Sequence, residues 1–293
     1  MKVLFVINPK SGRQPVANLE SQIADAAAQS GFEYQVHLME ASNEEQRISR
    51  LIKTYRPEIV AGAGGDGTIN LLARILKHTP VKLLILPIGS ANGMARELQL
   101  GNHIDALLQL ISSGKTIAID LLQVNGHICI HLADVGLNAR IVKRFELDTR
   151  RGLLTYARHL FREVFLLKTY KFIIRSNDLE SLHKAVSLTF ANASRYGTGA
   201  VINPIGRIND GKFELVIVKP FPKIYLFAIA WKMFRGTLQT SDYVKVISCS
   251  EAHIISSRKT TLQIDGEVIG KVKRISVEIL PQALQVIVPP ESL

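Results

Sequence analysis

The chain has 293 residues, of which 47% are hydrophobic and 21% are charged, the composition of an ordinary soluble protein with enough material for a core. No stretch approaches the roughly 18 apolar residues of a membrane-spanning helix, and Cys129 and Cys249 lie far apart in apolar stretches, which indicates reduced thiols in a cytoplasmic protein. The net charge of +11 fits an anionic membrane surface or a polyanionic small substrate. No basic stripe interleaved with aromatic residues is present, so we expect no nucleic-acid partner.

Residues 1–121 alternate short, almost wholly apolar runs with amphipathic stretches. The apolar runs predict strands at Val3–Ile7, Tyr34–Leu38, Ile59–Ala63 and Lys82–Leu86. The amphipathic stretches predict helices at Val16–Gln29, Asn43–Tyr55, Thr68–Lys77 and His103–Ser112. This order predicts an α/β domain with a parallel sheet covered on both faces, in which ligands bind at the carboxyl ends of the strands.

The run from Gly62 to Asn70 links the third strand to the next helix and carries four glycines in its first six residues. Glycines leave backbone N–H groups open to a ligand, and we expect Thr68 to cap a helix whose positive end attracts phosphate. Asp66 would repel that phosphate unless a divalent cation bridges the two, as magnesium does on a nucleotide. The alternative is a glycine-rich turn that only permits tight packing.

Two other loops rich in glycine and small polar residues also follow predicted strands. They span residues 8–13 and 87–93. In a parallel sheet both fall at the same edge as the loop 64–68. The convergence of three such loops favours phosphate binding over simple packing.

From about Ile117 onward the strands are shorter, and many alternate apolar with polar residues. They are predicted at Ile117–Val124, His127–Leu132, Tyr170–Arg175, Ala185–Ala191, Phe213–Val218, Val244–Ser248, Ala252–Ser256, Thr261–Ile264, Arg274–Ile279 and Gln285–Val288. Their spacing predicts an antiparallel β-sandwich, interrupted by helices at about Thr155–Leu167 and Ile224–Phe234. The second helix is apolar almost all round and too short to span a bilayer, so we expect it to be buried. The alternative is an interfacial segment that uses Trp231 and Phe234.

Five motifs occur in order along nearly the whole chain. They are Asn8-Pro9-x-Ser11-Gly12, Gly64-Gly65-Asp66-Gly67-Thr68-x-Asn70, Pro87-x-Gly89-Ser90-Ala91-Asn92-x-x-Ala95-Arg96, Asp210-Gly211 and Asp265-Gly266-Glu267. In this order and at roughly this spacing they resemble the bacterial diacylglycerol kinase catalytic-domain family, lipid kinases related to sphingosine kinases. The glycine motif also occurs in NAD kinases. The last motif, together with the sandwich-like half, selects the lipid branch.

The resemblance implies a nucleotide-binding α/β domain over residues 1–121, to which residues 281–293 return. It also implies a lipid-acceptor β-sandwich over residues 122–280, with the active cleft between the two. Catalysis would fall to Asp66, which holds the catalytic magnesium, and to Glu267 as general base. The residues implied to bind ATP are Asn8, Ser11, Gly12, Gly64, Gly65, Asp66, Gly67, Thr68, Asn70, Ser90 and Asn92. A structural Mg²⁺, where the family has one, maps onto the Asp210 side chain and the backbone carbonyls of Arg207 and Lys212.

Structural alternatives remain open for the acidic residues of the second half. Asp-Gly pairs favour hairpin turns, so both Asp210-Gly211 and Asp265-Gly266-Glu267 are also typical of turns. His131 and Asp134 either bear on the acceptor site or belong to the core. Asp120 either supports the metal network or caps a crossover strand.

The chain departs from the family pattern in several places, including two near the expected nucleotide site. Gly93 stands where the family usually has Asp, and Met39–Ser42 stand where a Thr usually follows the second strand. These departures leave ATP as the expected phosphoryl donor.

We therefore expect an ATP- and Mg²⁺-dependent kinase that phosphorylates a hydroxyl of a lipid at an anionic membrane surface. The protein would be cytoplasmic and peripherally membrane-associated, and an exposed sheet edge could pair it into a homodimer. One alternative is a kinase for a soluble polyol or a dinucleotide, as in NAD kinases. Another is a nucleotide- or lipid-binding regulator without turnover.

Overall fold

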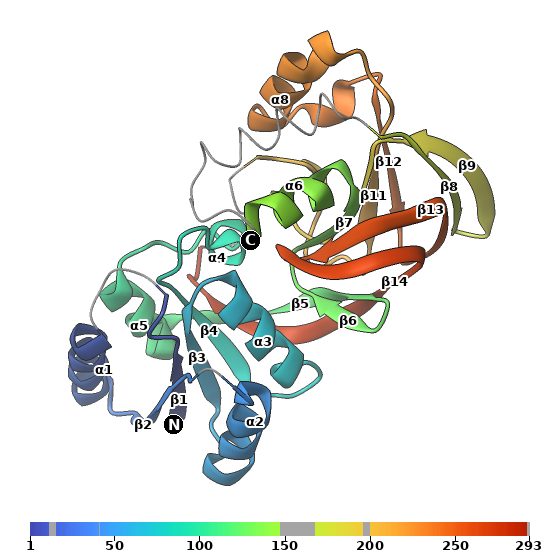
Figure 1. Ribbon diagram of the computed structural model, residues 1–293. Helices are drawn as coiled ribbons and strands as arrows, with labels where there is room; N and C mark the ends of the chain where they lie inside the picture. Colours follow the sequence, from blue (N-terminus) through green and yellow to red (C-terminus); the bar gives the residue numbers. More distant parts are fainter. Residues whose placement is uncertain (12–15, 41, 147–167, 196–199, 292–293) are drawn as a thin grey trace. The chain divides into compact units, whose positions relative to one another are not determined.

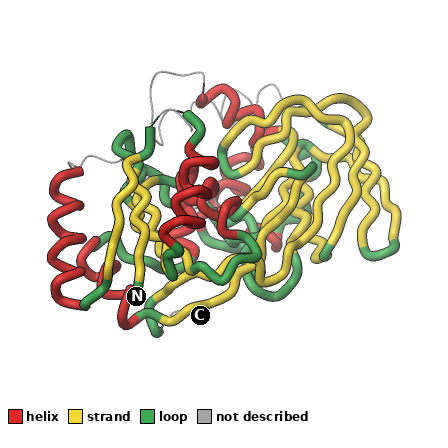
Figure 2. The backbone as a smooth tube through the Cα atoms, turned by 90° about the horizontal axis from the view of Figure 1, so that it is seen from below, coloured by secondary structure: helices red, strands yellow, loops and turns green. Residues whose placement is uncertain are grey.

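The computed structural model of the chain describes residues 1–11, 16–40, 42–146, 168–195 and 200–291. The chain divides into two compact units (Figure 1): unit 1 comprises Met1–Ile119 and Gln282–Leu293, and unit 2 comprises Asp120–Pro281. Strands alternate with helices in unit 1 and dominate unit 2 (Figure 2). The expected fold class, an α/β domain followed by an antiparallel β domain, is thereby confirmed.

The sheet of unit 1 is parallel. Its strands are β1 (Lys2–Ile7), β2 (Glu33–Leu38), β3 (Ile59–Gly64) and β4 (Lys82–Pro87), in the order β2-β1-β3-β4, and the end of β14 (Glu267–Val288) pairs with β4 in parallel. Ile7 lies opposite both Leu38 and Ala63, so the carboxyl ends of three neighbouring strands are level. The apolar runs of β1 and β3 are buried, as expected for strands covered on both faces.

Two pairs of helices cover this sheet (Figure 1). α1 (Val16–Ser30) packs against α5 (Ile104–Ser113) on one face, and α2 (Glu44–Tyr55) packs against α3 (Asp66–Leu76) on the other. Each of these helices buries a stripe of residues at helical spacing. The single-turn helix α4 (Gly93–Glu97) follows β4. All four strands and all four long helices predicted for this part of the chain are confirmed, with their ends within two residues.

Unit 2 is built from antiparallel strands. They are β5 (Lys115–Val124, which begins in unit 1), β6 (His127–Cys129), β7 (Leu132–Gly136), β8 (Tyr170–Ser176), β9 (Leu179–Ala185), β10 (Ser187–Ala191), β11 (Phe213–Val218), β12 (Val244–Cys249), β13 (Glu251–Ile264) and the first part of β14. One layer has the order β12-β11-β10-β7-β13. β13 also pairs with β14 and with the β8–β9 hairpin.

The long strand β13 takes part in both layers of the sandwich. Its residues 253–256 pair with β8, whereas its residues 262–264 pair with β7. The register shifts between Ile255 and Thr260, and such an irregularity bends a strand. The core between the layers includes Phe172, Phe190 and Phe213, all fully buried. Cys129 and Cys249 are buried here with unpaired thiols, as the sequence predicted.

Several predictions for unit 2 need correction. β13 and β14 are continuous where two strands each were predicted. The predicted strand at His127–Leu132 is broken, because the chain bends at residues 130 and 131, whose N–H groups donate to Asp265. β9 and the helix α6 (Leu137–Glu146) were not predicted. The helix predicted at Thr155–Leu167 lies outside the described residues.

The helix predicted at Ile224–Phe234 exists, but the expectation that it is buried is wrong. It forms a short 3-10 turn, η1 (Lys223–Tyr225), followed by α8 (Leu226–Phe234). Only Ile229 is buried in α8, whereas Trp231 and Phe234 are more than half exposed. None of the helices in the described part of the chain combines the length and apolarity needed to cross a membrane.

Candidate active site

Backbone hydrogen bonds join the three strand-end loops of unit 1. The Asn8 N–H donates to the Ala63 carbonyl (2.9 Å), and the N–H groups of Ile88 and Gly89 both donate to the Gly64 carbonyl (3.2 Å each). The loops after β1, β3 and β4 therefore lie side by side at the carboxyl edge of the sheet, where parallel α/β sheets bind ligands.

Glycine is required where two of these loops meet. A Cβ atom on Gly89 would lie 2.4 Å from the Gly65 Cα, and one on Gly64 would lie 2.3 Å from Thr68 Oγ1 and 2.5 Å from Thr68 Cβ. All three separations are far inside van der Waals contact. Tight packing therefore explains these glycines, and phosphate binding by the same loops stays a proposal.

Replacing Gly64 with alanine tests this packing directly. We expect the free energy of unfolding to fall by about 1–3 kcal/mol, because the new methyl group overlaps the rigid Cβ end of Thr68 rather than a flexible side-chain tip. Urea unfolding would measure the change. Gly101→Ala is the matched control, since a Cβ there meets nothing within 4 Å. Equal stability of the two variants would contradict the packing explanation.

Thr68 does not cap α3, contrary to the expectation. The helix begins at Asp66, and its N-cap is Gly65 in an extended conformation (φ −96°, ψ −170°). Thr68 lies in the first turn, where it is buried, and its Oγ1 accepts a hydrogen bond from Asn8 Nδ2 (3.3 Å). Thr68 thus links the loop after β1 to the start of α3.

Asp66 occupies the first position of α3 and bridges two loops. Its Oδ1 accepts a hydrogen bond from the Met94 N–H (3.4 Å) in the first turn of α4. Burial raises the pKa of the Asp66 carboxyl above its usual value, and the backbone N–H groups of Met94 and Gly93 oppose the rise. Burial thus disfavours the charged form of Asp66, and a cation bound beside it would favour that form.

The remaining predicted nucleotide residues lie on α3 and on the loops after β1 and β4. Gly67 is exposed in the first turn of α3, and Asn70 lies four residues after Asp66, on the same helix face. Ser90 is exposed after β4, and the Ser11 N–H donates to the Asn8 carbonyl (3.0 Å). Gly12 lies outside the described residues.

Asn92 has a left-handed backbone (φ 53°) and holds the loop after β4. Its Nδ2 donates to the carbonyls of Gly89 (2.8 Å) and Pro87 (3.2 Å). Its Oδ1 is buried and has no hydrogen-bond partner among the described residues. Magnesium in nucleotide sites is held by one or two carboxylates together with phosphate and water oxygens. The Asp66 carboxylate is of this kind, and the Asn92 Oδ1 atom is an amide oxygen that no described residue satisfies, so the residues present fit the cation that the motif implies.

The Asp265-Gly266-Glu267 motif forms the two-residue turn between β13 and β14. Ile264 pairs with Glu267, and both turn residues have positive φ (48° and 91°), as a type I′ hairpin requires. The Asp265 carboxylate accepts hydrogen bonds from the N–H groups of residues 130, 131 and 132 (2.8–3.0 Å). Burial raises the pKa of Asp265, and these amides oppose the rise. Asp265 therefore caps the bend at residues 130–132, and its motif forms the hairpin turn that the Asp-Gly pair also favours.

Glu267 projects from the first position of β14 and is exposed. Asp265 anchors one side of its hairpin, and Gln263 anchors the other. The Gln263 side chain is buried; its Oε1 accepts from the Gly266 N–H (2.8 Å), and its Nε2 donates to Asp134 Oδ2 (2.6 Å). The hairpin that presents Glu267 is thus held from both sides, by the Asp265 carboxylate and by the buried Gln263 side chain.

A family model described as the diacylglycerol kinase catalytic domain matches residues 2–124, and one described as the YegS C-terminal NAD kinase beta sandwich-like domain matches residues 132–288, more than half of the chain. The chain belongs to this family of lipid kinases. Curated relatives named probable lipid kinase YegS-like, from Yersinia pestis (strain Pestoides F) and Yersinia pseudotuberculosis serotype O:1b (strain IP 31758), are each 29% identical over 295 residues. The alignments cover 98% of this chain and 97% of each relative.

Solved structures agree in fold. The crystal structure of a diacylglycerol kinase from Bacillus anthracis str. Sterne superposes with a TM-score of 0.77 at 17% identity, and a second chain from that organism superposes with a TM-score of 0.82 at 19% identity. Each comparison covers 100% of this chain and 98% of the other. Membership in the lipid-kinase family makes the chain a phosphotransferase.

Three buried polar residues, His131, Asp134 and Gln263, lie near the hairpin of this lipid-kinase family member, and the sequence singled out only the first two. Burial raises the pKa of Asp134 to about 7, against hydrogen bonds from Asn138 and Gln263. Burial lowers the pKa of His131 to about 4, and its Nε2 has no partner among the described residues. Asp134 and Gln263 lie directly opposite each other on β7 and β13. Gln263 was missed, because a lone polar residue in an apolar strand carries no signal for such a contact.

We expect Gln263→Leu to loosen the hairpin that presents Glu267. The Gly266 N–H and Asp134 each lose a partner, so the free energy of unfolding should fall by about 1–3 kcal/mol. The rate constant kcat should fall, whereas KM for the nucleotide should change less, because the substitution leaves unit 1 unaltered. Steady-state kinetics and urea unfolding would measure both. Gln239→Leu, at an exposed glutamine, is the control. A less stable variant with an unchanged kcat would show that catalysis does not need this anchor.

The Asp210-Gly211 motif also forms a turn. The Lys212 N–H donates to Asp210 Oδ1 (3.0 Å), and the Gly211 N–H donates to the carboxylate of buried Asp120 (2.7 Å). Asp120 therefore caps this turn. Within the described residues no group of three or more His, Cys, Asp or Glu side chains is placed to hold a metal. The structural magnesium site at Arg207, Asp210 and Lys212 stays a prediction.

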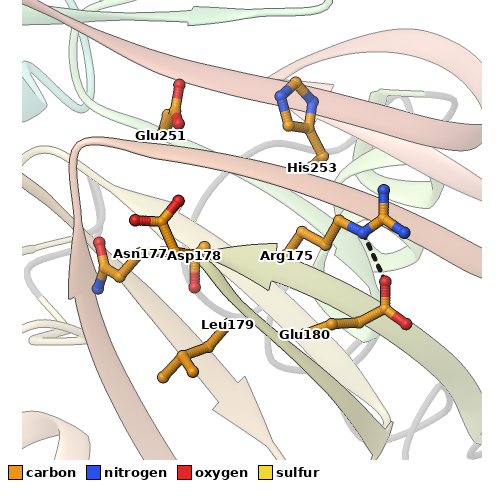
Figure 3. Close-up of a pocket in the computed structure, with 8 residues that line it drawn as sticks. Arg175, Asn177, Asp178, Leu179, Glu180, Glu251 and His253 are labelled. Carbon is orange, nitrogen blue, oxygen red and sulfur yellow. Dashed lines mark hydrogen bonds and ion pairs between the residues drawn. The ribbon is translucent and has the colours of Figure 1, made fainter.

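A cavity of about 250 Å³ lies at the β8–β9 turn (Figure 3). It is lined by Arg175, Ser176, Asn177, Asp178, Leu179, Glu180, Glu251 and His253. Arg175 and Glu180 form an ion pair within it (2.5 Å). None of these is a predicted site residue, so this cavity does not contribute to the candidate active site.

Proposed function

We propose that this lipid-kinase family member transfers the γ-phosphoryl group of ATP to a hydroxyl of a diacylglycerol-like or sphingoid-like lipid. Unit 1 binds the nucleotide at its strand-end loops, and unit 2 supplies the acceptor side. The observation that carries the proposal is the position of Asp66. Its partly buried carboxyl group has a raised pKa and lies at the start of α3, close in the fold to Gly64 and Gly89, where any side chain would clash.

In the proposed reaction the acceptor hydroxyl oxygen forms a bond to the γ-phosphorus, and the bond from that phosphorus to the β–γ bridging oxygen breaks. ADP leaves, and Glu267 accepts the hydroxyl proton as general base. Its exposure leaves the carboxylate open to an acceptor, and the two anchored sides of its hairpin fix its position.

Magnesium, when bound, neutralises the charge that develops on the transferred phosphoryl group. Asp66 is the residue that would hold it, with Asn92 Oδ1 as a second oxygen nearby in the fold. Asn8, Thr68 and the glycine backbone keep these loops together and supply the amides that a phosphate binds. In this proposal Ser11, Asn70 and Ser90, on or next to the same loops, also contact the nucleotide.

A soluble acceptor is the second candidate. It is favoured by one observation, the resemblance of residues 132–288 to a sandwich described as NAD kinase-like. The same catalytic residues serve either acceptor, because both present a hydroxyl. The two candidates therefore differ only in what unit 2 binds.

Transfer of label from γ-labelled ATP to a panel of acceptors tests the proposal. The panel contains diacylglycerol, sphingosine, phosphatidylglycerol and undecaprenol in mixed micelles with magnesium, and NAD and glycerol in solution. Thin-layer chromatography separates the products. We expect a labelled lipid; labelled NAD or glycerol would favour the second candidate. ATP binding without any labelled product would favour a regulator without turnover.

A further inference from the structure

α8 and the turn before it carry an apolar stripe that nothing in the described part of the chain covers. The apolar stripe consists of Ile224, Phe227, Trp231 and Phe234, whose exposed fractions are 81%, 72%, 61% and 63%. The last three follow a spacing of four and three residues, which places them on one face of the helix.

Folding of unit 2 does not account for the apolar stripe. The opposite face of α8 makes the core contacts, through buried Ile229 and partly buried Leu226 and Met233. The helix is therefore apolar on two faces and uses one of them for packing. Large exposed apolar patches on a folded protein mark interaction sites.

The charges around the apolar stripe identify the kind of partner. Residues 219–241 contain Lys219, Lys223, Lys232 and Arg235 and no acidic residue. The Arg235 guanidinium lies 4.8 Å from the centre of the Trp231 ring, so a cation flanks the stripe directly. Basic residues beside exposed aromatic ones on a short helix are typical of segments that lie in the headgroup region of an anionic bilayer.

We propose that α8 docks unit 2 on an anionic lipid bilayer, with the apolar stripe inserted at the level of the headgroups and the basic residues against lipid phosphates. This inference rests on the proposed function for its purpose, since a lipid acceptor resides in a bilayer. Its test needs neither nucleotide nor acceptor, so failure of docking and failure of phosphoryl transfer are observed separately.

Trp231 is the single tryptophan of the chain, so intrinsic fluorescence reports on α8 alone. The full-length protein is mixed with vesicles of equal parts phosphatidylcholine and phosphatidylglycerol, or with vesicles of phosphatidylcholine only. We expect a blue shift, and quenching by brominated acyl chains, with the anionic vesicles, and we expect both effects to weaken in high salt. An unchanged spectrum with anionic vesicles would overturn the proposal.

Vesicle flotation of two matched variants then locates the contact. Phe227→Ser/Trp231→Ser/Phe234→Ser should lower the partition coefficient by at least about tenfold. Leu179→Ser/Leu182→Ser should change it less than about twofold; these leucines of β9 are equally exposed, at 73% and 65%. Circular dichroism checks that both variants fold. Equal partitioning of the triple variant and the wild type would overturn the proposal. A different result would also overturn it: a wild-type protein that forms a dimer and does not bind vesicles, together with a triple variant that is a monomer. The apolar stripe would then bind a second copy of the chain.

Discussion

We expect Asp66→Asn to lower the rate of phosphoryl transfer by about a thousandfold or more, because it removes a negative charge that the proposal assigns to holding the cation at the nucleotide loops. The amide oxygen can still accept the hydrogen bond from the Met94 N–H, so the loops after β3 and β4 stay joined. The raised pKa of Asp66 adds a pH dependence. Magnesium needs the ionised carboxylate, so activity should fall as the pH is lowered through that raised pKa.

Initial rates and thermal unfolding, measured side by side, separate the loss of charge from a loss of structure. Asp105→Asn is the matched control, since Asp105 also lies in the first turn of a unit 1 helix but is exposed. Its rate should equal that of the wild type. An Asp66→Asn protein that retains a tenth of the wild-type rate would remove Asp66 from the proposed magnesium site.

The second large effect is expected at Glu267. Glu267→Gln keeps the size of the side chain and removes its capacity to accept a proton, so the rate should fall by about 10²–10⁴-fold. Because Glu267 is exposed and the hairpin is held by Asp265 and Gln263, stability should not change. The Kd for ATP should also stay unchanged, since the substitution lies outside unit 1.

Glu278→Gln serves as the control for this experiment, because Glu278 is an exposed glutamate on the same strand. Rates are measured at saturating acceptor, so that a change in acceptor binding does not enter. A Glu267→Gln protein with the wild-type rate would show that another group takes the proton.

The elements of unit 1 could be predicted closely because each signal is local. Strands buried on both faces are apolar throughout, and the helices between them bury residues at regular spacing. The start of α3 was misplaced by two residues, because Asp66 and Gly67 are poor helix formers whereas Thr68 is a common N-cap. A contact between loops sets the start of the helix instead. The Thr68 side chain accepts a hydrogen bond from Asn8, and the N-cap is the extended residue Gly65.

Unit 2 was less predictable because its structure depends on distant partners. The sequence of β9 does not alternate apolar with polar residues, and the strand exposes Leu179 and Leu182. The anchoring of Asp265 to residues 130–132 joins positions about 135 apart in the sequence, which no local pattern indicates. α8 has the composition of a core helix, and only the three-dimensional structure shows that one of its faces is uncovered.

The most direct test of lipid phosphorylation is the partition of label after incubation with γ-labelled ATP, magnesium and a bacterial total-lipid extract. The account predicts that label enters the chloroform phase with the wild-type protein and not with Asp66→Asn. Label confined to the aqueous phase, or equal labelling of the lipid phase by the two proteins, would contradict it.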